Sequence, residues 1–174
     1  MQTRRDPIAL AISGPLAAAA LLVWVSSSGA APAAPGESPL PTNLIVPEVV
    51  RPLVVSMLRK SPTFRRQCTR LAEQPKLLVH IRLVDGIRDG LALSLVERRG
   101  AGREAAVWIE LRQPARYVEA IAHELEHVLE QVEGTDLARL ARQRVDGVVD
   151  LGGQYETARA QSVGRTVARE AMVP

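Results

Sequence analysis

Apolar residues recur every three or four positions along residues 115–133, which is the spacing of one face of an α-helix. At about 100° per residue, they gather on one side of the helix: Val118, Ile121, Leu125, Val128, Leu129 and Val132. Gln113-Pro114 precedes this segment and Gly134 ends it. We therefore expect a helix that packs one side on the core and leaves the other side open to a cleft or to solvent.

Three shorter segments change to the pattern of strands. Residues 77–84, 91–96 and 105–111 are aliphatic and β-branched, and short turn-forming stretches that contain glycine separate them. Turns of this length usually join neighbouring antiparallel strands. The sequence therefore predicts a small three-stranded antiparallel sheet.

Helical spacing also covers residues 46–59, a segment after Ser61-Pro62, and residues 154–172. Ser61 suits the capping position of the second of these helices, and Pro62 suits its first helical position. Residues 137–149 predict a weaker helix or an ordered loop. The expected fold class is α+β, with the antiparallel sheet packed against the central helix and the C-terminal helix, and with further helices at the amino-terminal side.

The amino-terminal end has a different composition. Two arginines precede an almost uninterrupted apolar run at residues 8–25, and small residues follow this run. That order is typical of a secretory signal peptide, here residues 1–30. An apolar run of this length can also span a bilayer, so a membrane anchor is the alternative. Residues 31–42 contain four prolines and predict a flexible linker, which leaves a single folded domain at residues 43–174.

Charge and cysteine content narrow the class of partner. The chain has 22 Lys and Arg residues against 19 Asp and Glu residues, and the two signs are interspersed. This distribution is typical of an ordinary solvated surface and not of a nucleic-acid interface. Cys68 is the only cysteine, so the chain cannot form an internal disulfide. We expect an exported protein, periplasmic or secreted, that contacts a membrane only if residues 8–25 are retained.

The central helix carries two of the three histidines of the chain, His123 and His127, and Glu124 directly follows the first. Residues four apart in a helix lie one turn apart on the same face, so both imidazoles can bind one zinc ion. Glu124 can then act as general base toward a zinc-bound water. This HExxH pattern predicts a zinc-dependent peptidase that acts on a peptide or protein substrate.

A catalytic zinc ion usually has three protein ligands and one open position. Glu156 is the favoured third ligand, because the sequence places it in the first turn of the C-terminal helix at the head of an apolar face. A carboxylate there is costly unless it is paired or binds a metal. Asp136, Asp146 and Asp150 are the alternatives, and a site without a third protein ligand also remains open.

The motif and the glutamate that follows it resemble the gluzincins, the thermolysin-like tribe of zinc peptidases. In that tribe a second helix after the HExxH helix carries a glutamate ligand. The resemblance covers the HELEH motif at residues 123–127 and Glu156, with 28 residues between them. It implies His123, His127 and Glu156 as ligands of one zinc ion and Glu124 as the base.

The chain departs from the pattern of that tribe at several positions. Glu126 places a charge within the motif, Tyr155 replaces the asparagine that usually precedes the ligand glutamate, and Ala160 stands where an aspartate would orient a histidine. No histidine follows the motif to stabilise the transition state. Tyr155 is a candidate for that catalytic role, together with Arg159 and Arg165.

The leading hypothesis is an exported zinc metallopeptidase. A second hypothesis is a catalytically degenerate module on the same fold that binds zinc, or a peptide or protein partner, without turnover. A third is a helical interaction domain without metal, in which His123 and His127 belong to a solvated charged face with Glu119, Glu126 and Glu130.

Overall fold

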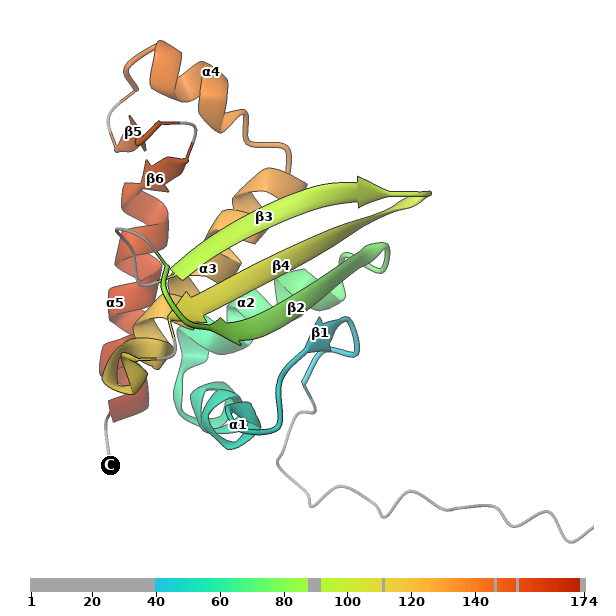
Figure 1. Ribbon diagram of the computed structural model, residues 1–174, viewed down its shortest axis with the longest axis vertical. Helices are drawn as coiled ribbons and strands as arrows, with labels where there is room; N and C mark the ends of the chain where they lie inside the picture. Colours follow the sequence, from blue (N-terminus) through green and yellow to red (C-terminus); the bar gives the residue numbers. More distant parts are fainter. Residues whose placement is uncertain (1–39, 88–91, 111, 146, 153, 173–174) are drawn as a thin grey trace, which may run out of the picture. The chain divides into compact units, whose positions relative to one another are not determined.

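The computed structural model describes residues 40–87, 92–110, 112–145, 147–152 and 154–172 (Figure 1). The predicted leader, residues 1–30, lies outside the described residues, and so do residues 31–39 of the predicted linker. Leu40, which was expected in that linker, packs partly against the core. In chain order the elements are β1 (Leu44–Ile45), α1 (Arg51–Lys60), α2 (Pro62–Ala72), β2 (Leu77–Val84), β3 (Ala92–Arg99), β4 (Gly102–Glu110), the 3₁₀ turn η1 (Pro114–Arg116), α3 (Tyr117–Val132), α4 (Leu137–Arg142), β5 (Val148–Asp150), β6 (Tyr155–Thr157) and α5 (Ala158–Met172).

Four strands form a mixed sheet in the order β1-β2-β4-β3. β2 pairs in parallel with both β1 and β4, and only β3 runs antiparallel, against β4. The α+β class is therefore confirmed, but the predicted three-stranded antiparallel sheet is wrong. β4 lies between the two strands that precede it in the chain, and its alternate residues Ala105, Val107 and Ile109 are all buried. A strand with such an apolar face is most stable at the centre of the sheet, because this position buries the most apolar surface. Each Å² of apolar surface that is buried stabilises the fold by about 25 cal/mol.

Helices cover one face of the sheet. Leu77, Val79 and Ile81 of β2 are buried, whereas Leu78 and Arg82, which point to the opposite face, are exposed. In Figure 1, α3 lies behind β3 and β4, and α5 runs beside α3. None of the helices in the described residues is both long and apolar enough to cross a membrane.

Helix α3 confirms the helix that the apolar spacing predicts at residues 115–133. It is buried far beyond its apolar stripe, because α2, α5 and the sheet surround it. Gly164 allows α5 to approach closely: a Cβ atom at that position would lie 3.0 Å from both the Glu119 carbonyl oxygen and the His123 Cβ atom. Real Cβ atoms rarely make contacts this short, so a larger residue would push the two helices apart.

The C-terminal helix begins later than the sequence predicts. α5 starts at Ala158, because the Thr157 hydroxyl accepts a hydrogen bond from the Ala160 N–H at 3.0 Å and so caps the helix. The three residues before it form β6, which pairs antiparallel with β5. Near the other end of α5, the Glu170 carboxylate accepts hydrogen bonds from Ser61 and Thr63, where α1 meets α2.

Candidate metal centre

The two motif histidines lie one turn apart on α3, as the sequence predicts. Their ring centroids are 4.8 Å apart and the rings are nearly perpendicular. His123 is half-buried and His127 is buried. Both rings border a cleft of about 930 Å³, which α3 shares with β3, α4, β6 and α5.

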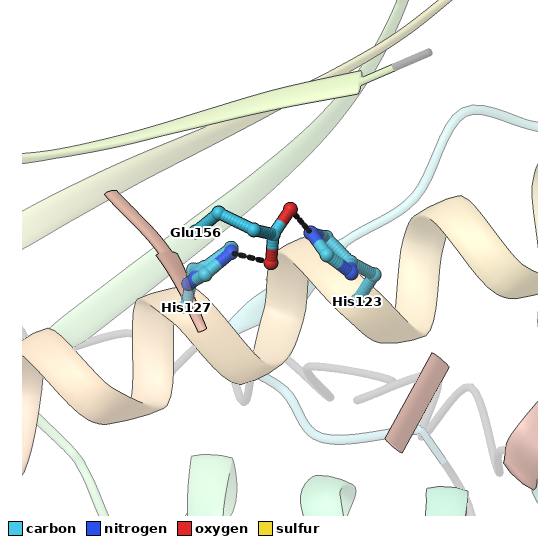
Figure 2. Close-up of side chains that lie close together, drawn as sticks. All are labelled: His123, His127 and Glu156. Atoms are coloured by element: carbon cyan, nitrogen blue, oxygen red, sulfur yellow. Dashed lines mark ion pairs between the residues drawn. The ribbon is translucent and has the colours of Figure 1, made fainter. Parts of the chain in front are cut away.

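Glu156 extends from β6 toward both imidazoles (Figure 2). Its Oε2 atom is 3.4 Å from His123 Nε2, and its Oε1 atom is 3.6 Å from His127 Nε2. One ligand atom from each of the three residues can be chosen so that all lie within 4.8 Å of one another. The sequence therefore anticipates this grouping, but Glu156 reaches it from a short strand and not from the first turn of a helix.

Both separations exceed the usual length of a direct hydrogen bond. N–H···O bonds usually measure 2.7–3.2 Å between heavy atoms, and both nitrogen–oxygen contacts are longer than that. Around a tetrahedral zinc ion with bonds of about 2.1 Å, neighbouring ligand atoms are about 3.4 Å apart. The three ligand atoms lie within 4.8 Å of one another, so they would draw slightly closer to share one ion. Two imidazole nitrogens and one carboxylate oxygen also form a ligand set typical of catalytic zinc, with a fourth position left open.

Charge interactions shift the pKa values of two of the three side chains, His127 and Glu156. Burial opposes the imidazolium of His127, but Glu130 and Glu156 outweigh burial and raise its pKa to about 9. Burial also opposes the Glu156 carboxylate, but His123, His127 and the Thr157 N–H outweigh it and lower the pKa of Glu156 well below its usual range. The carboxylates around the two rings make this a site that attracts a cation.

Glu124 lies beside the three residues in the same cleft. Its Oε1 atom is 3.9 Å from His123 Nε2, and the residue is 6% exposed. Burial raises the pKa of Glu124, while a hydrogen bond with Ser94 of β3 and the two histidines oppose that rise. A raised pKa makes a carboxylate a stronger base than an ordinary one, which suits the role of a general base.

The edge of the sheet forms one wall of the cleft. Ala92, Leu93, Ser94 and Leu95 line it in succession, so both the backbone and the side chains of β3 border the cleft. Among the strands of the described residues, β3 pairs with β4 alone. The free edge of β3 can therefore hydrogen-bond to an extended chain.

The candidates for transition-state stabilisation come from β6 and α5, and only two of them border the cleft. Tyr155 and Arg165 line the cleft beside Glu156. Arg159 does not, because its guanidinium forms ion pairs with Glu126 at 2.6 Å and Glu133 at 3.5 Å. Tyr155 and Arg165 therefore border the cleft, and Arg159 does not.

The alternative third ligands take other roles or lie elsewhere. Asp136 accepts a hydrogen bond from the Arg139 N–H at 2.8 Å and so caps α4. Asp150 lies on the exposed part of β5. Asp146 lies outside the described residues. Within the described part of the chain, the only group of three or more His, Cys, Asp or Glu residues close enough to hold an ion is that of His123, His127 and Glu156.

Two further glutamates of α3 are buried, which contradicts the interpretation of their side of the helix as a solvated charged face. Glu126 is 1% exposed and Glu130 is 3% exposed. Glu126 accepts hydrogen bonds from Gln67 Nε2 and Arg70 Nη1, both at 2.8 Å, and pairs with Arg159. Its carboxylate therefore joins α3 to α2 and α5. These contacts account for a charged residue at position 126, between the two histidines of the motif.

Sequence reasoning missed three residues that support the site, namely Ser94, Glu130 and Thr157. Glu130 follows His127 by three residues, so helical spacing alone could have indicated their contact. Ser94 and Thr157 had no such signal, because each contacts a residue of α3 at least 27 positions away in the chain.

No protein-family model, curated protein or solved structure matches this chain.

Proposed function

We propose that this protein is a zinc-dependent metallopeptidase that hydrolyses peptide bonds. The observation that carries the proposal is the grouping of two imidazole nitrogens and a Glu156 oxygen within 4.8 Å, with the buried carboxylate of Glu124 beside them in a cleft. A surface ion pair would supply only part of this set. The combination of three ligands, a base and space for a substrate is what metal-assisted hydrolysis requires.

Each residue of the site has a distinct task in this proposal. His123, His127 and Glu156 hold one zinc ion, which when bound polarises the scissile carbonyl and lowers the pKa of water. Glu124 takes the proton of the attacking water and passes it to the leaving amine. Tyr155 and Arg165, which line the same cleft, are the residues that we propose to stabilise the negative charge on the carbonyl oxygen.

The cleft favours an extended peptide as substrate. A peptide that adds to a sheet edge forms main-chain hydrogen bonds, and its alternate side chains enter neighbouring pockets. The free edge of β3 borders the site from Ala92 to Leu95. We further propose that the enzyme acts after export, in the periplasm or as a secreted protein, on the basis of the signal-peptide pattern at residues 1–30; a membrane anchor at residues 8–25 is the alternative.

A zinc-binding module without turnover is the second candidate. The observation that favours it is the lack of any histidine after His127 in the sequence. The charge of Glu126 gives it no support, because that carboxylate faces Gln67, Arg70 and Arg159 and does not line the cleft. The two candidates share the metal site and differ in the role of Glu124.

Metal content and peptide hydrolysis of the purified protein test the proposal. We expect about one zinc ion per chain, loss of that zinc in His123→Ala, and weaker zinc retention in Glu156→Gln. Glu124→Gln should keep zinc and lose on the order of 100-fold to 10,000-fold in hydrolysis of a peptide library. Glu97→Gln, an exposed carboxylate of β3, serves as the matched control.

Each result separates the candidates. If Glu124→Gln retains zinc and hydrolyses peptides as fast as the unmodified protein, the proposed mechanism is wrong. Zinc without any hydrolysis in the unmodified protein supports the module without turnover. If the protein binds no zinc at millimolar concentration, both candidates fail.

A further inference from the structure

We propose that Glu130 is a positioning residue that fixes two of the three zinc ligands, His127 and Glu156, in one arrangement. This inference rests on the metal site of the proposed function and does not require hydrolysis. Glu130 lies one turn beyond Glu126 on α3, and both carboxylates are buried. Their surroundings differ, and the difference indicates their roles.

Glu130 contacts His127 directly. Its Oε2 atom is 3.1 Å from His127 Nδ1. An ionised carboxylate can only accept hydrogen bonds, so Nδ1 of the imidazole must be the donor. In a neutral imidazole this leaves the lone pair on Nε2, which is the atom that faces Glu156 Oε1. Glu130 therefore selects the tautomer and the ring orientation that metal binding needs.

Glu130 also reaches the second ligand through Thr157. The Thr157 hydroxyl donates to the Glu130 carboxylate, 2.9 Å from Oε1 and 3.1 Å from Oε2. The N–H of the same threonine donates to Glu156 Oε1 at 2.8 Å. Because Thr157 is also the cap of α5, a single carboxylate joins the histidine of α3 to the junction of β6 and α5.

The charge balance around Glu130 supports a role at a cation site. Glu126 is compensated by Arg70 and Arg159, whereas within the described residues Glu130 forms an ion pair with His127 alone. A buried carboxylate without an arginine or lysine partner is costly. A zinc ion bound to His127 would place positive charge one imidazole away from Glu130 and would offset that cost.

The variants are chosen so that the positioning contacts can be removed in steps. Glu130→Gln keeps the size of the side chain and removes its charge, and we expect it to weaken zinc binding about 10-fold to 100-fold. Thr157→Val removes the hydroxyl that joins Glu130 to the Glu156 segment, and Thr157→Ser retains it. Glu126→Gln is the matched control, because it removes an equally buried carboxylate of the same helix that touches none of the ligands.

The experiment measures two quantities on the full chain. Chelator competition gives the zinc affinity of each folded variant, and proton NMR detects the hydrogen-bonded Nδ1–H of His127, assigned by its loss in His127→Ala. We expect weaker zinc binding in Glu130→Gln and Thr157→Val, near-normal binding in Thr157→Ser and Glu126→Gln, and a protected Nδ1–H that disappears or shifts in Glu130→Gln.

The positioning role and the metal site fail in different ways. If the unmodified protein binds zinc and both Glu130→Gln and Thr157→Val bind it equally well, Glu130 does not position the ligands although the metal site stands. If Glu130→Gln does not fold, the comparison of Thr157→Val with Thr157→Ser decides in the same way. If the unmodified protein binds no zinc, the proposed function fails and the positioning of zinc ligands by Glu130 is overturned with it.

Discussion

Replacing Glu126 by glutamine should destabilise the fold and leave zinc bound. Glu126 lies inside the HExxH motif, so a reading of the motif alone would assign any effect of this substitution to the metal site. In the structure the carboxylate turns away from the cleft. It accepts hydrogen bonds from Gln67 and Arg70 of α2 and forms an ion pair with Arg159 of α5. Its loss should therefore weaken the packing of three helices.

The size of the effect follows from these bonds. A hydrogen bond to a charged group contributes about 1.5–3 kcal/mol to stability. Glutamine keeps one acceptor oxygen, and the Arg70 and Arg159 side chains, 27% and 46% exposed, regain contact with water once the carboxylate is gone. We expect a net loss of about 2–4 kcal/mol, which for a domain of this size lowers Tm by roughly 6–15 °C.

Thermal unfolding followed by circular dichroism measures this effect, with Glu97→Gln as the exposed control, which should change stability by less than about 0.5 kcal/mol. Arg70→Met should destabilise as well, and the double variant should lose less than the sum of the two single losses because the residues are in contact. A Tm within 2 °C of the unmodified protein, or a strict sum in the double variant, would refute the structural role of Glu126. Loss of zinc from folded Glu126→Gln would show that the carboxylate acts on the metal site instead.

Three further predictions concern other parts of the fold. Removal of zinc with a chelator should lower Tm, since an ion that binds only the folded chain stabilises it by about 4 kcal/mol at a thousandfold excess over Kd; an unchanged Tm would count against the site. Gly164→Ala should lower the free energy of unfolding by about 1–3 kcal/mol and weaken zinc binding, because the new Cβ atom would contact α3 beside His123. Differential scanning calorimetry measures the first effect, and a zinc titration measures the second. Burial alone would raise the pKa of Glu170, but hydrogen bonds from Ser61 and Thr63 outweigh burial and lower this pKa. The pKa of Glu170 is therefore lower in the folded than in the unfolded chain. The stability that the ionised Glu170 contributes is present above about pH 4.5 and is lost as the pH falls. Urea titrations from pH 7 to pH 3 should show this loss in the unmodified protein and a flatter profile in Glu170→Gln.

The sequence predicts the elements of this fold better than their arrangement. The bounds of β2 agree with the predicted segment, and α3 begins and ends close to its apolar spacing, because both patterns are local. The order of the strands in the sheet depends on which arrangement buries the most apolar surface, and no pattern within a single segment encodes this order. β1 has only two residues, too few to show a period of two.

The candidate site shows the same division between local and distant information. His123, Glu124 and His127 can be located from one helical turn, and Glu156 from the cost of a carboxylate on an apolar face. The burial of Glu126 and Glu130 could not be predicted, because a helical wheel that counts apolar residues treats all charged positions as exposed. Their polar partners, such as Gln67 and Thr157, come from segments distant in the sequence.

The origin of the proposed ligands in two separate elements has a consequence for following the folding of this chain. His123 and His127 are in place as soon as α3 forms, but Glu156 joins them only when β6 and α5 have docked along that helix. An isolated α3 peptide would therefore offer two ligands and the folded protein three. The visible absorption of bound cobalt reports the number and geometry of its ligands. It could therefore follow the docking of α5 during folding separately from the formation of helices.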